Sequence, residues 1–160
     1  MDKKLKDYLD KNEIKYKLHK HIAVFRVIES KKIHEKISGL HCKTLFLKDN
    51  NENFYLVGMP AEKKLCTKSL KRHLGVKKIN FGSPNELKLK TGLVPGSVSI
   101  FGIINSDKDV GIVIDKIVWE SEIVGFHPNV NTETLEISHS DLKKYYESLN
   151  CKKNILNISI

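Results

Sequence analysis

The chain has 160 residues, of which 40% are hydrophobic and 29% charged, a composition that is ordinary for one globular domain. No apolar run approaches the roughly 18 residues of a membrane span, and the N-terminus lacks the apolar core of a signal peptide. We therefore expect a single cytoplasmic domain over residues 1–160, with no membrane contact. The 28 Lys and Arg residues against 19 Asp and Glu residues give a net charge of +9, which favours a polyanionic partner without identifying it.

The first forty residues change between helical and strand patterns. Residues 2–12 have apolar positions at helical spacing and predict a helix. Residues 16–25 mix β-forming residues with histidines, which is typical of a short strand and a loop. Residues 27–37 return to helical spacing, and Gly39 is a plausible end for that helix.

The clearest strand signal is a hairpin near the middle of the chain. Residues 44–47 and 54–57 are rich in β-forming residues and flank the polar run 49–53. Residues 67–74 then predict a helix that begins at Thr67 and ends at Gly75.

A second helix start follows at Ser83, where Ser caps, Pro84 occupies the first turn and Glu86 reaches back to the cap. Gly92 ends this helix.

The remaining segments predict a second hairpin, a strand and a helix. Residues 98–104 and 110–118 are apolar and β-branched, and the polar residues 105–109 between them predict a turn. Residues 135–137 form a short strand, and Ser138 caps a last helix. Hairpins without regular βαβ alternation favour an α+β fold, with a mixed, mainly antiparallel sheet flanked by helices.

Common catalytic motifs are absent from the sequence. It has no phosphate-binding loop, no dinucleotide fingerprint, no deaminase signature and no nucleophile elbow. The seven histidines form no His-Glu-x-x-His pair, and the three cysteines form no Cys-x-x-Cys pair. We therefore expect no metal site, no disulfide framework and no cofactor.

Three local features remain, and each has a plain structural reading beside a functional one. Lys43 opens an apolar strand, either as a solvated edge residue or as a fixed cation that stabilises an oxyanion or a phosphate. The segment Gly96–Gly102 is either a strand between two glycines or a place where backbone N–H groups approach a ligand. The residues 125–132 are either an ordinary loop or a functional one. Taken alone, none of the three identifies a reaction.

Taken together and in this order, these features resemble the YbaK-type aminoacyl-tRNA editing domain. The resemblance is closest to the stand-alone deacylases related to the editing insert of bacterial prolyl-tRNA synthetase, and it runs from about residue 5 to residue 149. It rests on His21-Ile22-Ala23-Val24-Phe25, His41-Cys42-Lys43-Thr44-Leu45-Phe46-Leu47, Phe54-Tyr55-Leu56-Val57, Phe81-Gly82-Ser83-Pro84-Asn85-Glu86-Leu87, Pro95 to Asn105, and Gly125 to Thr132. Two positions depart from the family pattern: Ile100 stands where proline is frequent, and Thr44 stands where the alanine-specific branch often has asparagine.

The resemblance implies a cleft that holds the 3′-terminal adenosine of a tRNA and its esterified amino acid. It gives the catalytic role to Lys43, which we interpret as an electrostatic and positioning group, since a lysine pKa of about 10.4 makes a poor base. It places the segment 96–102 at the pocket floor and His127 near the mouth. The substrate-binding residues that we predict are Thr44, Gly96, Ser97, Val98, Ser99, Phe101, Gly102, His127, Ile22 and Val24.

The implied activity is hydrolysis of mischarged prolyl-tRNA, most plausibly Ala-tRNA-Pro, with the mischarged acceptor end as partner and prolyl-tRNA synthetase as a further candidate. A water molecule attacks the ester, and the neighbouring ribose hydroxyl is a candidate activator. The acceptor stem is expected to contact five basic residues, Lys63, Lys64, Lys68, Lys71 and Arg72. Alternatives are an inactive tRNA- or synthetase-binding module, an appended synthetase domain, or an editing domain for Cys or another small amino acid.

Overall fold

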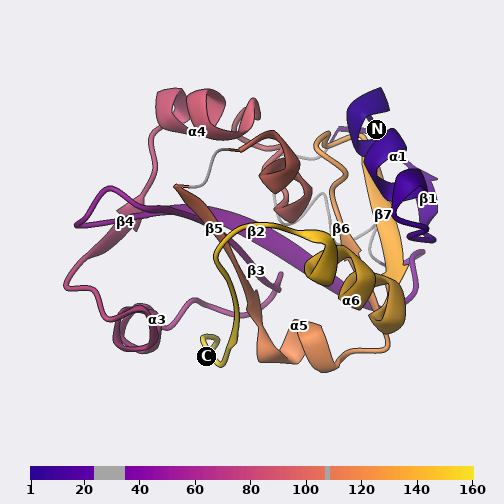
Figure 1. Ribbon diagram of the computed structural model, residues 1–160. Helices are drawn as coiled ribbons and strands as arrows, with labels where there is room; N and C mark the ends of the chain where they lie inside the picture. Colours follow the sequence, from indigo (N-terminus) through magenta and orange to yellow (C-terminus); the bar gives the residue numbers. More distant parts are fainter. Residues whose placement is uncertain (24–34, 107–108) are drawn as a thin grey trace.

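The computed structural model describes residues 1–23, 35–106 and 109–160. In these ranges eight strands form one sheet in the order β1-β7-β6-β2-β3-β5-β8, with β4 beside β2 (Figure 1). The strands are β1 (Lys17–Lys20), β2 (Leu40–Asp49), β3 (Phe54–Pro60), β4 (Ile79–Phe81), β5 (Val110–Asp115), β6 (Ile123–Phe126), β7 (Glu133–Ser138) and β8 (Lys153–Leu156). The helices are α1 (Lys3–Lys11), α3 (Thr67–Leu74), α4 (Pro84–Thr91), the 3-10 helix η1 (Ile100–Asn105), α5 (Lys116–Glu120) and α6 (His139–Ser148).

The sheet mixes both strand orientations. The pairs β1–β7, β6–β7, β2–β3 and β2–β4 are antiparallel, whereas β2–β6, β3–β5 and β5–β8 are parallel. The predicted α+β fold with a mixed, mainly antiparallel sheet and flanking helices is confirmed.

Most of the predicted elements are present where the sequence places them. Asp2 caps α1, and Ser138 caps α6 by accepting a hydrogen bond from the Asp141 amide. The hairpin is the β2–β3 pair, in longer strands than predicted. A full capping box between Ser83 and Glu86 begins α4. Of the helix predicted over residues 27–37, residues 27–34 lie outside the described residues.

The prediction of a second hairpin over residues 98–118 is wrong. Residues 100–105 form η1, and β5 pairs in parallel with β3 before the chain enters α5. The cause is local: the Ser99 hydroxyl accepts a hydrogen bond from the Phe101 amide and so begins a helical turn. Residues 100–103 are all buried. Their sequence therefore lacks the alternation of apolar and polar residues that marks a half-buried strand, and it cannot distinguish a strand from a helix.

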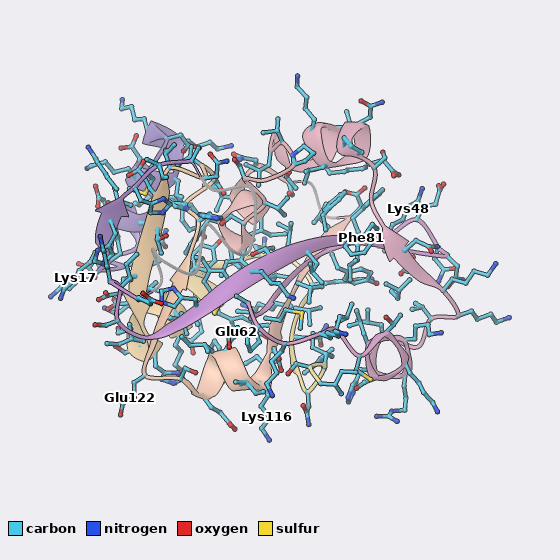
Figure 2. The ribbon with its side chains drawn as sticks, turned by 180° about the vertical axis from the view of Figure 1, so that it is seen from behind. Lys17, Lys48, Glu62, Phe81, Lys116 and Glu122 are labelled. Atoms are coloured by element: carbon cyan, nitrogen blue, oxygen red, sulfur yellow. The ribbon has the colours of Figure 1, made fainter. Side chains whose placement is uncertain are left out.

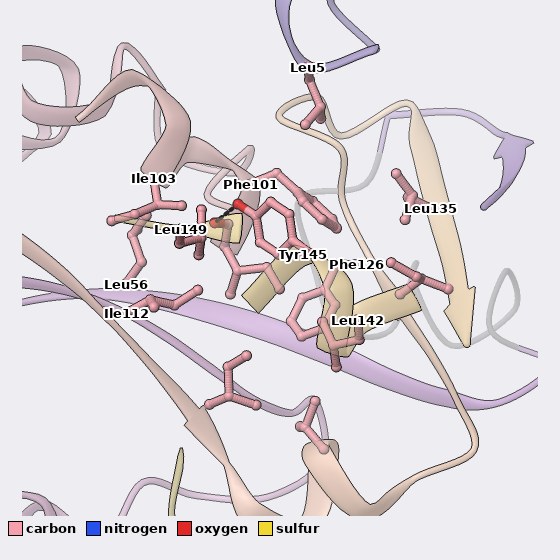
Figure 3. Packing of buried hydrophobic residues seen from close by; sticks show 14 of the residues in the cluster. Leu5, Leu56, Phe101, Ile103, Ile112, Phe126, Leu135, Leu142, Tyr145 and Leu149 are labelled. Atoms are coloured by element: carbon pink, nitrogen blue, oxygen red, sulfur yellow. Dashed lines mark hydrogen bonds between the residues drawn. The ribbon is translucent and has the colours of Figure 1, made fainter. Parts of the chain in front are cut away.

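The two faces of the sheet have separate cores. One face packs against α1, α4, η1 and α6 through a large cluster that includes Phe101, Phe126 and Tyr145 (Figure 3). The other face packs against α3 and the C-terminal segment through a smaller cluster that includes Leu47, Leu70 and Ile158. Side chains along β2 and β3 alternate between these two cores.

No helix in residues 1–23, 35–106 or 109–160 is both long and apolar enough to cross a membrane.

Candidate active site

Lys43 lies on β2 opposite Met59 of β3, on the face of the sheet that packs against α3. Its ammonium donates a hydrogen bond of 2.6 Å to the backbone carbonyl of Lys63, in the connection between β3 and α3. Partial burial lowers the pKa of Lys43 from its ordinary value of 10.5. The lysine is therefore tied to a basic loop and is half-buried, which differs from a freely solvated edge residue.

The same face carries a row of polar side chains towards β6 and β7. His41 precedes Lys43 by two residues, so both side chains lie on the same face of β2, and His41 pairs with Gly125 of β6. A Cβ added to Gly125 would lie 3.7 Å from His41 Nδ1 and 3.2 Å from Thr134 Cγ2, so both side chains lie over this glycine. The Thr134 hydroxyl is 2.9 Å from His21 Nε2. Lys43, His41, Thr134 and His21 thus belong to one polar face, which we call the lysine face.

His127 joins the lysine face at the end of β6. Its ring centroid is 6.2 Å from that of His21, and its Nδ1 is 3.0 Å from the carbonyl oxygen of Glu133. A carbonyl only accepts, so Nδ1 carries the proton and Nε2 of the neutral ring carries the lone pair. Burial, and to a smaller extent His21, lowers the pKa of His127 from 6.5, while the Glu133 carbonyl opposes this shift. The ring is therefore neutral at pH 7, with an acceptor at Nε2.

Thr44 and the segment 96–102 lie on the opposite face. Thr44 pairs with Gly58, and a Cβ added at Gly58 would lie 2.9 Å from Ile100 Cγ2. Thr44 Oγ1 is buried and has no hydrogen-bond partner among the described residues. Adjacent residues of one strand thus point to different faces, and the structure places Thr44 and the segment 96–102 on the face opposite Lys43.

The segment 96–102 serves the core at its C-terminal end. The amides of Ser97, Phe101 and Gly102 donate to the Val94 carbonyl, the Ser99 hydroxyl and the Ser99 carbonyl, so these three are not free for an oxyanion. Phe101 and Ser99 are fully buried, and Val98 is half-buried. A Cβ on Gly102 would lie 2.6 Å from Leu93 Cδ1, so close packing accounts for this glycine.

The start of that segment is a surface turn, where Gly96 is exposed and has a φ of 89°. Positive φ favours glycine, as the sequence suggested. Ile22 is 78% exposed and does not line an enclosed pocket in the described residues. Val24 lies outside the described residues.

The predicted tRNA-binding residues gather beside the lysine face. Lys63 and Lys64 are exposed in the loop that holds the Lys43 ammonium, and α3 follows directly. Lys68 and Arg72 on α3 are exposed, and Lys71 is half-buried. Figure 2 shows β2 crossing the molecule from behind, with Glu62 of this loop close below it. These five basic residues, which we call the basic surface, therefore lie on the side of the sheet that carries Lys43.

Three members of the lysine face, His21, His41 and Thr134, were not assigned a role from the sequence. Their only signal was their placement: two histidines lie in the matched segments, and Thr134 follows the loop 125–132 in the chain. Within residues 1–23, 35–106 and 109–160, no group of three or more His, Cys, Asp or Glu side chains is placed to hold a metal ion. Burial raises the pKa of the Cys42 thiol, so this neighbour of Lys43 is not an activated nucleophile.

A cavity of about 410 Å³ lies elsewhere, between α1, η1 and the end of α6. It is lined by Tyr8, Ile103, Ile104, Ser106, Ser148, Leu149, Asn150 and Cys151. None of these residues belongs to the predicted site.

The structure is therefore an α+β domain with a lysine near the start of a central strand and a basic loop beside it. The family model of the aminoacyl-tRNA editing domain matches residues 29–145, and the chain belongs to this family. The predicted resemblance and the prediction of an aminoacyl-tRNA editing enzyme are thereby confirmed.

Relatives and solved structures agree with this assignment. The chain is 34% identical over 138 residues to the prolyl-tRNA editing protein ProX of Acetoanaerobium sticklandii, covering 85% of this chain and 84% of the relative. It is 30% identical over 151 residues to the prolyl-tRNA synthetase associated domain-containing protein 1 of Mus musculus, covering 90% and 88%. The crystal structure of the hypothetical protein APE2540 shares the fold, with a TM-score of 0.80 and 21% identity over 99% of this chain and 100% of that one.

Proposed function

We propose that this protein hydrolyses the ester bond of mischarged prolyl-tRNA, with Ala-tRNA-Pro as the principal substrate. The observation that carries this proposal is the Lys43 ammonium, half-buried on the lysine face and tied to the basic loop that precedes α3. An anionic RNA end that follows this loop arrives beside a fixed cation and beside His127. The similarity to the prolyl-tRNA editing protein of A. sticklandii supports the choice of tRNA.

Lys43 stabilises the negative charge that develops during the reaction and positions the substrate. Ester hydrolysis builds negative charge on the carbonyl oxygen, and a preorganised cation stabilises that charge most where water is partly excluded. The Lys63 carbonyl holds the ammonium until a stronger acceptor, a phosphate or an oxyanion, replaces it. Lys43 therefore contributes to the transition state without acting as a base.

The nucleophile is a water molecule, since among the described residues no activated serine or cysteine lies on the lysine face. His127 Nε2 accepts a hydrogen bond at pH 7 because its Nδ1 proton is engaged by Glu133. It orients this water or the ribose hydroxyl of the substrate. Lys43 thus stabilises the developing negative charge, and His127 accepts a hydrogen bond from the water or the ribose hydroxyl.

Editing is needed because a site built for proline discriminates weakly against a smaller amino acid. Each missing methylene is worth only about 1–3 kcal/mol, so alanine is attached at a measurable rate. A second pocket that admits alanine and excludes proline by size corrects this error. The predicted pocket residues Thr44, Gly96–Gly102, Ile22 and Val24 stay predictions for this role.

Phosphates of the acceptor stem are the partners of the basic surface. Lys63, Lys64, Lys68 and Arg72 are exposed beside Lys43, and Lys71 is half-buried among them. Neutralising phosphates releases counterions, which gives affinity without sequence selectivity. We place the reaction in the cytoplasm, where tRNA is charged, and prolyl-tRNA synthetase is a candidate partner.

The test is a deacylation assay with tRNA charged with Ala, Cys, Ser or Pro, using the wild type, Lys43→Ala and Lys43→Arg. We expect loss of Ala, sparing of Pro, and a decrease of about a hundred- to thousandfold in Lys43→Ala. Lys43→Arg keeps the charge and controls for its removal, so it is expected to retain more activity than Lys43→Ala.

Equal rates for the wild type and Lys43→Ala would remove Lys43 from the mechanism. Binding of tRNA without turnover of any ester would favour the inactive binding module. Faster loss of Cys or Ser than of Ala would keep the enzyme and change its substrate.

A further inference from the structure

Asn129 has a buried side chain with unsatisfied polar atoms. The residue is 7% exposed, and neither Oδ1 nor Nδ2 has a hydrogen-bond partner in the parts of the chain that the structure describes. Its backbone is left-handed, with a φ of 64°. Native proteins rarely leave both ends of a buried amide unpaired, so this side chain calls for an explanation.

Asparagine is not required here by the backbone. Glycine adopts a positive φ with less strain and brings no polar side chain. A buried donor or acceptor without a partner costs the folded state its lost hydration. The Asn129 amide therefore destabilises the free protein unless another molecule completes its hydrogen bonds.

The loop that carries Asn129 begins at His127, a member of the lysine face. Asn129 follows His127 by two residues, and the loop is closed by the bond between His127 Nδ1 and the Glu133 carbonyl. The His21 amide donates to the Thr132 carbonyl at 2.9 Å, which ties the loop to the residues after β1. A ligand that reaches His127 therefore lies at the edge of the loop that holds the unsatisfied amide.

The chemistry of a carboxamide defines the ligand group. It presents one acceptor and one donor side by side, and it is matched by an edge with an adjacent donor and acceptor. The N6 amino group and N7 of adenine form such an edge, which asparagine binds with two hydrogen bonds. Every tRNA substrate ends in an adenosine, whichever amino acid it carries.

We propose that the Asn129 carboxamide binds the N6 and N7 edge of the terminal adenine of the tRNA. This inference rests on the proposed function and adds a residue that positions the substrate's last nucleotide. Because both polar atoms are buried in the free protein, adenine binding includes a movement of the loop 127–132. Hydrogen bonds to the adenine then satisfy both polar atoms of the carboxamide.

The experiment combines Asn129→Gly with a substrate that lacks N7. Ala-tRNA ending in adenosine is compared with Ala-tRNA ending in 7-deazaadenosine, for the wild type, Asn129→Gly and the control Asn150→Ala, which changes an exposed asparagine. We expect the wild type and the control to lose about tenfold in kcat/KM on the 7-deaza end. Asn129→Gly is expected to lose at least that much on the ordinary end and nothing further on the 7-deaza end.

Stability supplies the second readout. Asn129→Gly removes an unsatisfied amide, so its urea midpoint is expected to equal or exceed that of the wild type. Full sensitivity of Asn129→Gly to the 7-deaza end, or a lower midpoint with unchanged kcat/KM, would overturn the proposal. If the wild type hydrolyses no ester, the proposed function fails by itself. Binding of the two uncharged tRNA ends, measured by fluorescence anisotropy, then decides the adenine contact with the same variants.

Discussion

The two faces of the sheet around β2 use neighbouring residues for opposite purposes. Lys43 points to the lysine face, where polar side chains and a basic loop surround it. Thr44 points towards Gly58 and Ile100 on the other face, which packs against α1, α4, η1 and α6 and which we call the apolar face. The apolar face holds Phe101, Phe126 and Tyr145 in contact (Figure 3). Successive side chains of a strand point to opposite faces, so the neighbours Lys43 and Thr44 have different roles. Lys43 faces the proposed reaction, and Thr44 faces the core that supports it. Substitutions on the two faces should therefore affect different observables.

Phe101→Ala gives the largest expected effect on stability. Phe101 is fully buried against Phe126 and Tyr145, and loss of such a ring costs about 3–5 kcal/mol of unfolding free energy. Urea denaturation followed by circular dichroism measures this loss, and activity per folded molecule is expected to stay within a few fold. A loss below 1 kcal/mol with abolished turnover would instead make Phe101 a pocket wall, as the sequence suggested.

His127→Ala tests the lysine face. We expect kcat to fall by about a hundredfold, because an oriented acceptor is lost. Burial lowers the pKa of His127 from 6.5, so activity should fall at a lower pH than an ordinary histidine would give, when Nε2 is protonated.

The same shift affects stability with a definite sign. As the pH falls through 6.5, the unfolded chain takes up a proton at residue 127 before the folded chain does. The unfolding free energy of the wild type should therefore decrease in this window, and that of His127→Ala should decrease less. Identical pH profiles for the two proteins would contradict this account.

Tyr145→Phe should reduce stability and leave the reaction intact. The Tyr145 hydroxyl donates a 2.9 Å hydrogen bond to the Ile100 carbonyl, and its removal takes one hydrogen bond from that buried carbonyl. The expected cost is about 0.5–1.5 kcal/mol by urea denaturation, with unchanged kcat. A selective loss of kcat would connect the apolar face to the chemistry.

Local signals predicted the elements of the fold well. The capping box at Ser83 and Glu86 and the cap at Ser138 depend on neighbouring residues, so they can be read from the chain. The prediction of the second hairpin was wrong because residues 99–103 are buried against partners such as Leu93 and Tyr145. Burial on all sides removes the alternation that separates a strand from a helix.

The candidate site was predicted only in part for a related reason. Lys43 and His127 were found from motifs, but their neighbours come from strand register, which joins His41 to Gly125 and Thr134 to His19. Register is set by the whole sheet. By contrast, the separation of Thr44 from Lys43 follows from the alternation of side chains along a single strand.

Lys68→Ala combined with Arg72→Ala gives the smallest expected effect. Each substitution removes one phosphate contact from the basic surface beside the lysine face, so the slope of log K against log salt should decrease by about 0.7–0.9 per residue. Lys4→Ala with Lys11→Ala on α1, far from α3 in Figure 1, is the matched control and should leave the slope unchanged. Equal changes for both pairs would indicate diffuse attraction by the net charge.

The most direct test of the central claim locates the substrate end on one of the two faces. A hydrolysis-resistant analogue, adenosine with L-alanine joined by an amide at the 3′ position, is titrated into isotope-labelled protein and followed by amide chemical shifts. The account predicts the largest shifts at Lys43, His127 and Thr134, with Ile103, Ser148 and Cys151 around the cavity unchanged. The largest shifts at that cavity, with a silent lysine face, would contradict it.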